Sequence, residues 1–234
     1  MSLRFNLEER ERGLRNGFSD KKVALITMGC AKNLVDSESI LGVLLEKGCR
    51  LVADPEQAEV IILNTCAFVR EAREETFQVL RKLSLLKGRG RCRRLIVAGC
   101  MVNWSVPDIR RNFPEVDGYI GPGNYSRMAE VLIRPSPKPV TGFSYSYPEE
   151  RAHRLLPRNS VSSYIRIAEG CSNCCSYCLI PRLRGGFRSR RMESVFREAR
   201  HLVSSGIREI NIIAQDTTSY GTDLYGEQRL VQLL

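Results

Sequence analysis

Cysteine is the residue whose type and spacing in this sequence could most directly do chemistry. Of the nine cysteines in the 234-residue chain, four lie within eight residues, in the run Cys171-Ser-Asn-Cys-Cys-Ser-Tyr-Cys178. Cys171, Cys175 and Cys178 have the spacing C-x-x-x-C-x-x-C. Thiolates bind iron–sulfur clusters, and a cluster of four irons held by three cysteines keeps one iron open for another ligand. We therefore predict an open 4Fe–4S cluster on this loop.

Other interpretations of the loop stay open. Structural zinc sites usually draw two pairs of ligands from separated segments, which one eight-residue loop does not readily supply, and the thiols could also be inert. Cys174 adjoins a predicted ligand but falls outside the spacing. It could compete for iron or only occupy the loop.

Three other cysteines share a placement along the chain. Cys30, Cys66 and Cys100 each follow a predicted strand by one or two residues. The carboxyl ends of parallel strands lie at one edge of a sheet, where open α/β folds bind ligands, so these thiols could converge on one metal site. The alternative is that they are packed as small apolar side chains, as free cysteines often are. Of the remaining two, we expect Cys49 in the core and Cys92, in the basic stretch RGRCRR, at the surface.

Composition and charge limit the class of protein. The chain has 36 Lys and Arg against 26 Asp and Glu, a formal net charge of +10, and 43% hydrophobic residues, which is typical of a globular protein. The amino-terminal residues lack the apolar stretch of a secretory signal, and no apolar run is long enough to span a bilayer. An odd number of cysteines without a signal favours reduced thiols in the cytoplasm.

Strands and helices alternate along the chain in the order that builds a parallel sheet. Apolar runs typical of buried strands are followed by segments with helical spacing. The predicted strands are 23–28, 60–64, 95–99, 116–120, 163–170 and 208–214, and the predicted helices are 34–48, 70–88, 105–113, 124–133 and 192–206. The alternation predicts an open α/β sheet with right-handed crossovers.

The domain boundaries follow from composition. Residues 1–21 are charged, lack periodicity and are expected to form a flexible tail. Residues 22–134 are the expected amino-terminal domain, and 135–160, which are rich in proline and serine, the expected linker. Residues 161–234 are expected to begin a second α/β domain that carries the Cys171–Cys178 loop.

Several segments together resemble the radical S-adenosylmethionine (SAM) methylthiotransferase family. The similar segments of the first domain are 28–38, 64–66 and 99–100, and those of the second are 167–171, 181–185 and 188–190. Within the family, the segments KNLVDSE (32–38), IAEGC (167–171) and AQDTTSYG (214–221) are similar to the branch that methylthiolates an aspartate β-carbon in a small-subunit ribosomal protein.

The resemblance implies a fold, cofactors and site residues. It implies an open parallel-sheet methylthiotransferase domain followed by the start of a radical SAM partial (β/α) barrel, with the chain ending inside that barrel. It also implies two 4Fe–4S clusters, on Cys30, Cys66 and Cys100 and on Cys171, Cys175 and Cys178. SAM at the second cluster would give a hydrogen-abstracting radical, and the first cluster would present the sulfur. Tyr177 is expected to pack on the SAM adenine and Gln215 to contact SAM, with ordinary loop packing as the alternative for both.

The expected partners are a small-subunit ribosomal protein or the ribosome, and an electron donor such as a flavodoxin or ferredoxin. The basic runs 81–94 and 182–191 could contact RNA, form solvated faces or, in part, orient the SAM carboxylate. No membrane partner is expected. The rival functions are a tRNA methylthiotransferase that acts on a modified adenosine and a non-catalytic iron–sulfur or zinc RNA-binding module.

Overall fold

A five-stranded parallel sheet forms the larger part of the fold, in a computed structural model that describes residues 20–133, 138–143 and 154–234. The strand order is β2-β1-β3-β4-β5. The strands are β1 (Lys22–Thr27), β2 (Arg50–Leu51), β3 (Val60–Thr65), β4 (Arg94–Gly99) and β5 (Gly118–Ile120). The predicted α/β class is confirmed. Residues 1–19 of the expected tail lie outside the described residues.

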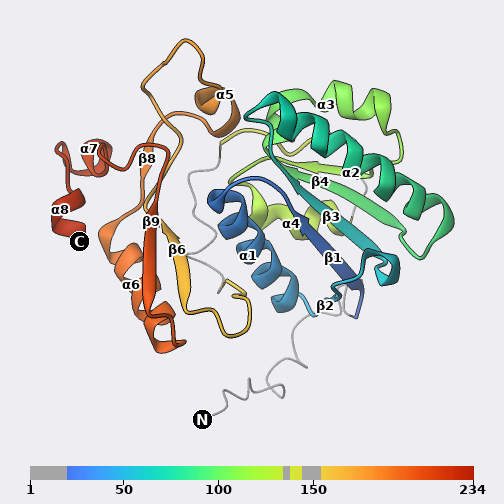
Figure 1. Cartoon of the computed structure of the whole chain (residues 1–234), viewed down its shortest axis with the longest axis horizontal. Coiled ribbons are helices and arrows are strands. Elements are labelled where there is room, and N and C mark those ends of the chain that lie inside the picture. Colours follow the sequence, from blue (N-terminus) through green and yellow to red (C-terminus); the bar gives the residue numbers. More distant parts are fainter. Residues whose placement is uncertain (1–19, 134–137, 144–153) are drawn as a thin grey trace.

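Helices cover both faces of this sheet (Figure 1). The helices are α1 (Ala31–Glu46), α2 (Arg70–Arg89), α3 (Cys100–Asn112) and α4 (Met128–Ile133). Side chains alternate along β3: Ile61 and Leu63 pack with α2 and α3, whereas Val60 and Ile62 pack with α1 and α4. Because both faces are buried, the central strands β3 and β4 carry runs of consecutive apolar residues rather than an apolar residue at every second position.

A second, smaller unit follows. Parallel strands β6 (Ser162–Arg166) and β9 (Glu209–Ile213) are connected through α6 (Met192–Ser204), the order of a β-α-β unit. The shorter elements are β7 (Ala168–Glu169), β8 (Arg188–Ser189), α5 (Ile180–Arg184), α7 (Thr222–Tyr225) and α8 (Leu230–Leu233). The predicted strand 163–170 is interrupted at Ile167, since β6 pairs with β9 whereas β7 pairs antiparallel with β8.

Between the two units, the described part of the expected linker follows the first sheet. Val140 forms a parallel bridge with Ile120, and its N–H donates to the Tyr119 carbonyl at 2.9 Å. Two 3₁₀ turns, Pro55–Gln57 and Tyr125–Arg127, complete the first unit. None of the described helices is long and apolar enough to cross a membrane.

Two local expectations are corrected. Helix α3 begins at Cys100 rather than near 105. Ser105, with φ −160° and ψ 89°, divides the helix in two. Its Oγ accepts from the Asp108 N–H at 3.3 Å, as an N-cap does, so the predicted helix corresponds to the second part of α3. Cys92 is buried, not at the surface, and its thiol donates to the Arg94 carbonyl. Cys49 is buried, as predicted.

Candidate metal centre

Three cysteines lie at the carboxyl edge of the first sheet. Cys30 is the N-cap of α1, three residues after β1; Cys66 follows β3 directly; and Cys100 follows β4 as the first residue of α3. Cys30 is exposed, Cys66 is half-buried and Cys100 is buried. The order β2-β1-β3-β4-β5 reverses between β1 and β3, and ligands of open α/β sheets bind at such a switch point. Cys30 and Cys66 flank that point.

Gly29 shows how closely the first two loops approach each other. Its φ is +90°, a conformation that favours glycine, and a Cβ built there would lie 2.6 Å from the Cys66 Cβ and 3.1 Å from its Sγ. Any side chain at position 29 would occupy the space beside the Cys66 thiol. The Gly29-Cys30 turn therefore lies against Cys66.

Buried polar side chains bind the three cysteine-bearing loops together. Asn33 Nδ2 donates to the Met28 and Thr65 carbonyls, both at 2.8 Å, and so links the ends of β1 and β3. Thr65 Oγ1 donates to the Ala98 carbonyl at 2.6 Å and accepts from the Met101 N–H at 3.2 Å, and so links β3 to β4 and α3. The loops are positioned by hydrogen bonds that do not involve the thiols.

The Cys100 thiol lies among charged groups as well as apolar ones. The pKa of Cys100 is raised to about 11, chiefly by burial and in smaller part by the neighbouring Cys66, whereas the charge of the Arg184 guanidinium acts in the opposite direction. Without a metal, the thiol is therefore protonated at neutral pH. A cationic neighbour favours the thiolate, which is the form that binds metals.

Arg184 belongs to a buried ionic cluster that connects the two units, made of Asp36 on α1, Arg166 on β6, Glu169 on β7 and Arg184 on α5. Asp36 accepts from Arg166 at 2.6 Å and from Arg184 at 3.0 Å. Glu169 accepts from the same two guanidinium groups at 2.8 and 2.9 Å. Two cations and two anions thus neutralise one another away from solvent, as buried charges require.

The role of these charged residues was not among the expectations from sequence. Asp36 and Glu38 occupy buried positions of α1, where helical spacing alone would place apolar residues. Glu38 pairs with Arg154, which also pairs with Glu198 of α6. In the sequence, the sign of this cluster is that carboxylates occupy helix positions whose spacing otherwise predicts apolar residues, while basic residues elsewhere in the chain can pair with them.

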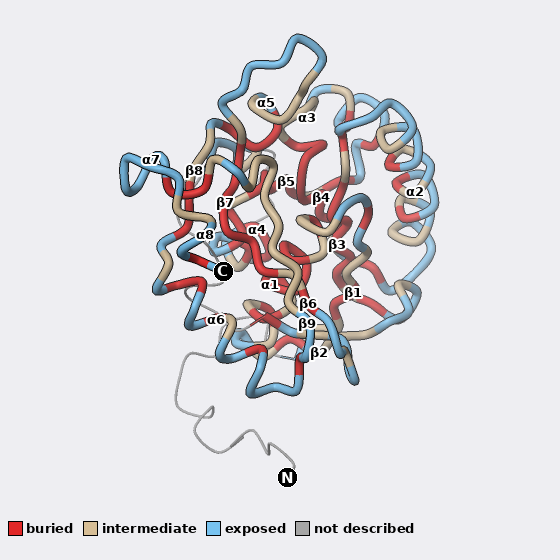
Figure 2. The backbone as a smooth tube through the Cα atoms, turned by 60° about the vertical axis from the view of Figure 1, so that its left-hand side comes forward, coloured by how far each residue is buried: buried red, intermediate tan, exposed pale blue. Residues whose placement is uncertain are grey.

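The Cys171–Cys178 loop, between β7 and α5, is mostly exposed (Figure 2). Cys171 and Cys178 are half-buried, and Cys174 and Cys175 are exposed. The Cys171 N–H donates to the Gly185 carbonyl at 3.1 Å, and the Cys178 N–H to the Cys175 carbonyl at 3.0 Å. Cys174 has φ +50° and its side chain is exposed, unlike those of Cys171 and Cys178.

The two residues expected at SAM lie in different surroundings. Tyr177 is 84% exposed. Gln215 lies just after β9, and its Nε2 donates to Glu169 Oε1 at 2.6 Å, which attaches it to the buried ionic cluster. Gln215 Oε1 is buried and accepts no hydrogen bond from any described residue. A polar ligand could provide that donor.

The donor set fits an iron–sulfur cluster. All six candidate ligands are thiols, at the edge of a sheet and on a loop with N–H groups beside it. Among the described residues, no three His, Cys, Asp or Glu side chains are grouped closely enough to hold a single metal ion. A four-iron cluster takes each thiolate on a different iron, so its ligands need not crowd around one atom.

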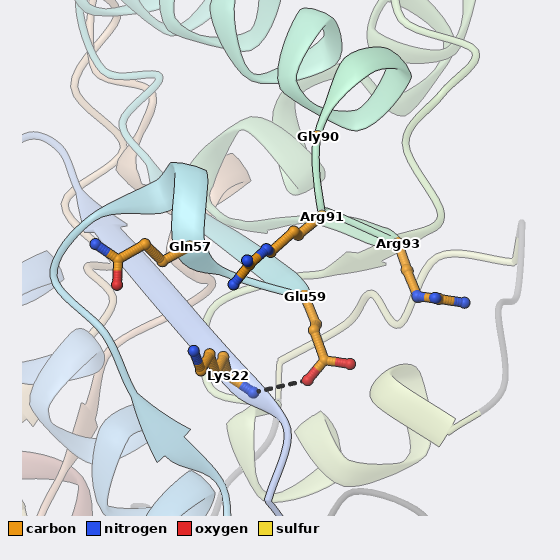
Figure 3. Close-up of a pocket in the computed structure, with 6 residues that line it drawn as sticks. All are labelled: Lys22, Gln57, Glu59, Gly90, Arg91 and Arg93. Atoms are coloured by element: carbon orange, nitrogen blue, oxygen red, sulfur yellow. Dashed lines mark hydrogen bonds between the residues drawn. The ribbon is translucent and has the colours of Figure 1, made fainter.

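A cavity of about 550 Å³ lies at the opposite, amino-terminal edge of the sheet (Figure 3). Basic residues of β1 and of the segment before β4 line it, together with Glu59, whose pKa is lowered by its hydrogen bond with Lys21. Its lining residues are Lys22, Gln57, Glu59, Gly90, Arg91 and Arg93. The cysteines and this cavity are at opposite ends of the parallel strands, so the two are separate sites.

The basic run 182–191 serves mostly internal contacts. Arg184 and Arg190 are buried in ion pairs, and Arg182 stacks on the ring of Trp104 at 4.5 Å. The buried arginines are not accessible to RNA phosphates. In the run 81–94, by contrast, Arg81, Lys82, Arg89, Arg91 and Arg93 are exposed.

Comparison with known proteins gives a consistent result. Residues 22–121 match the family model described as "Uncharacterized protein family UPF0004". The ribosomal protein uS12 methylthiotransferase RimO of Geobacter sulfurreducens is 45% identical over 218 residues, which cover 92% of this chain and 49% of that protein. The RimO of Clostridioides difficile is 41% identical over 217 residues, 91% of this chain and 49% of that protein. The chain spans about half the length of these relatives.

Solved structures of the radical S-adenosylmethionine methyltransferase TsrM from Kitasatospora setae share the fold. One, with cobalamin and a [4Fe-4S] cluster bound, has a TM-score of 0.55 and 13% identity, over 92% of this chain and 51% of that one. Another, with tryptophan and a SAM analogue bound, has a TM-score of 0.54 and 14% identity, over 85% of this chain and 48% of that one. Residues 22–121 therefore carry the domain of the UPF0004 family model, and over nine-tenths of its length the chain is similar to proteins named as RimO methylthiotransferases.

Proposed function

We propose that this chain is part of a radical SAM methylthiotransferase that adds a methylthio group to the β-carbon of an aspartate in ribosomal protein uS12. The observation that carries the proposal is the placement of Cys30, Cys66 and Cys100 after β1, β3 and β4, in a chain 41–45% identical to RimO proteins over more than nine-tenths of its length. Because uS12 is a ribosomal protein, the reaction belongs in the cytoplasm.

In this proposal the residues divide into two sets. Cys30, Cys66 and Cys100 hold one 4Fe–4S cluster, and Cys171, Cys175 and Cys178 hold the other, with one iron free for SAM. When bound, the clusters and SAM supply the electron, the radical that removes a hydrogen atom, and the methylated sulfur. The reducing electron would come from a donor such as a flavodoxin or ferredoxin.

The chain's own side chains bind and orient. Tyr177 is exposed on the cluster loop, where its ring can stack on adenine. Gln215 has one buried oxygen that no described residue satisfies, and an N–H or O–H group of SAM could donate to it. Arg166 and Arg184 hold Glu169, two residues before Cys171, in place at the base of the loop.

Reductive cleavage of SAM tests this function. The anaerobically reconstituted chain is incubated with SAM, a reductant and either uS12 or tRNA, and 5′-deoxyadenosine and the masses of both substrates are measured. We expect 5′-deoxyadenosine and the replacement of one hydrogen of uS12 by a methylthio group, and neither in the Cys175→Ala variant. Modification of tRNA instead would establish the tRNA enzyme. A chain that holds iron but gives no 5′-deoxyadenosine would be the non-catalytic module.

A further inference from the structure

Arg184 links the strand-end cysteine site to the part of the chain that carries the other cysteine loop. It is the last residue of α5, six residues after Cys178, and its side chain is 2% exposed. Helix α5 packs on the start of α3, where Asn103 Nδ2 donates to the Leu183 carbonyl at 2.9 Å. A side chain from the second unit is thus inserted beside the first residue of α3, Cys100.

The guanidinium uses its donors on both units. Nη2 donates to Asn33 Oδ1 at 2.6 Å and to Asp36 Oδ2 at 3.0 Å, and Nη1 donates to Glu169 Oε2 at 2.9 Å. These partners lie in several directions around one planar group, which a lysine ammonium cannot reproduce.

Through Asn33 the same guanidinium acts on the other two cysteine loops. Because Arg184 donates to Asn33 Oδ1, the amide must turn its Nδ2 toward the Met28 and Thr65 carbonyls, to which it donates. Met28 precedes the Gly29-Cys30 turn, and Thr65 precedes Cys66. Arg184 therefore orients the amide that links the loops of Cys30 and Cys66.

We infer that Arg184 is a positioning residue for the cluster proposed on Cys30, Cys66 and Cys100, an inference that rests on the proposed function. Through Asn33 it holds two of the three cysteine loops, and its positive charge lies at the edge of the sheet where the cluster would gain an electron on reduction. Charge near a cluster helps to set its reduction potential, and groups behind the ligands orient them and tune a metal site. Arg184 thus raises the midpoint potential of this cluster.

Arg190 provides a matched control for a purely structural role. It belongs to the same basic run, is 1% exposed, pairs with the buried carboxylate of Glu198, and donates through Nε to Ser194 Oγ at 2.8 Å. Its guanidinium also donates to the Arg166 and Ser194 carbonyls, which likewise belong to the second unit. If burial and ion pairing alone mattered, replacing either arginine with lysine would have the same effect on the cluster.

The experiment isolates the first cluster in a chain in which Cys171, Cys175 and Cys178 are replaced by alanine. Arg184→Lys, Arg190→Lys and the double variant Arg184→Met with Glu169→Gln are made in this background. The double variant removes one cation and one anion together, so that Arg166 and Asp36 remain as a neutral pair and the fold is preserved. Midpoint potentials are measured by redox titration monitored by electron paramagnetic resonance, and folding by circular dichroism.

We expect Arg184→Lys and the double variant to shift the midpoint potential to more negative values, with the larger shift in the double variant, and Arg190→Lys to leave it unchanged. Equal potentials in the parent, Arg184→Lys and the double variant would overturn the inference while leaving the proposed function intact. An equal shift in Arg190→Lys would show that general destabilisation is the cause and would also overturn it. A parent chain that binds no cluster would refute the proposed cluster site itself.

Discussion

Replacing Glu169 with glutamine tests the buried ionic cluster that joins the two units. The change keeps the shape of the side chain and removes its charge, which leaves the guanidinium groups of Arg166 and Arg184 with Asp36 as their shared carboxylate. Removing one member of a buried ion pair costs about 3–5 kcal/mol, because the remaining charge stays buried without its partner. We therefore expect a large loss of stability in the metal-free chain.

The pKa of Glu169 gives a second estimate of the same loss. Burial alone would raise this pKa, but Arg184, Arg166, the Gln215 amide and the Gly170 N–H lower it from 4.5 to about 2. At about 1.4 kcal/mol for each tenfold change, the ionised carboxylate stabilises the fold by about 3 kcal/mol at pH 7. Because the pKa is lowered on folding, this stabilisation is complete above about pH 4.5 and is lost as the pH falls through about 2.

Urea denaturation followed by fluorescence measures the effect. Trp104, the only tryptophan, lies where α3 meets α5, and its ring contacts Arg73 and Arg182. We expect Glu169→Gln to lower the free energy of unfolding by about 3 kcal/mol at pH 7 and by about 2 kcal/mol at pH 3.5. The control is Glu74→Gln, which breaks an exposed pair with Arg70 and should cost at most about 0.5 kcal/mol. Equal losses for the two variants would refute the reasoning.

Three further predictions concern other residues. Cys174→Ala should keep the iron content and spectra of both clusters, because Cys174 is exposed and outside the spacing of the trio; loss of one cluster would mean that Cys174 is a ligand. Gly29→Ala should weaken iron binding at the first site, because the new Cβ would lie 2.6 Å from the Cys66 Cβ. Gly206→Ala, also at positive φ but with open space around it, should leave iron binding intact. Equal iron contents in the two variants would contradict the close approach. Replacing Arg91 and Arg93 with glutamate should weaken binding to ribosomal RNA and reduce the slope of the log binding constant against log salt concentration by about 2. The same change at the exposed Arg197 and Arg200 of α6 should do neither. Identical binding curves for the two variants would rule out the cavity edge as an RNA contact.

The sheet and its cysteine edge could be predicted from sequence for a physical reason. Strands buried on both faces must be apolar throughout, so the runs at 60–64 and 95–99 were recognisable, and each ends just before a cysteine. Parallel pairing then brings Cys66 and Cys100 to one edge. The start of α3 was missed because Ser105 and Pro107 suggest a helix N-terminus there, whereas the first turn begins at Cys100.

The ionic cluster could not be predicted in the same way. Its members are up to 148 residues apart, as with Asp36 and Arg184, and no periodicity relates them. A charged residue in a helix or loop is usually solvated, so sequence alone favours the surface for Arg184 and Arg190. The structure buries both because carboxylates from other elements neutralise them. Cys92 illustrates the converse, since its basic neighbours suggested exposure although the thiol itself is buried.

The central claim is that two separate cysteine trios hold two clusters. The most direct test of this claim is the iron and sulfide content per chain. After anaerobic reconstitution, the native chain should bind about eight irons, four for each cubane. Replacing Cys30, Cys66 and Cys100 together with alanine should leave about four, as should replacing Cys171, Cys175 and Cys178, whereas replacing the buried Cys49 and Cys92 should leave all eight or so. Either trio variant retaining the full iron content, or a native chain that binds only zinc, would contradict the account.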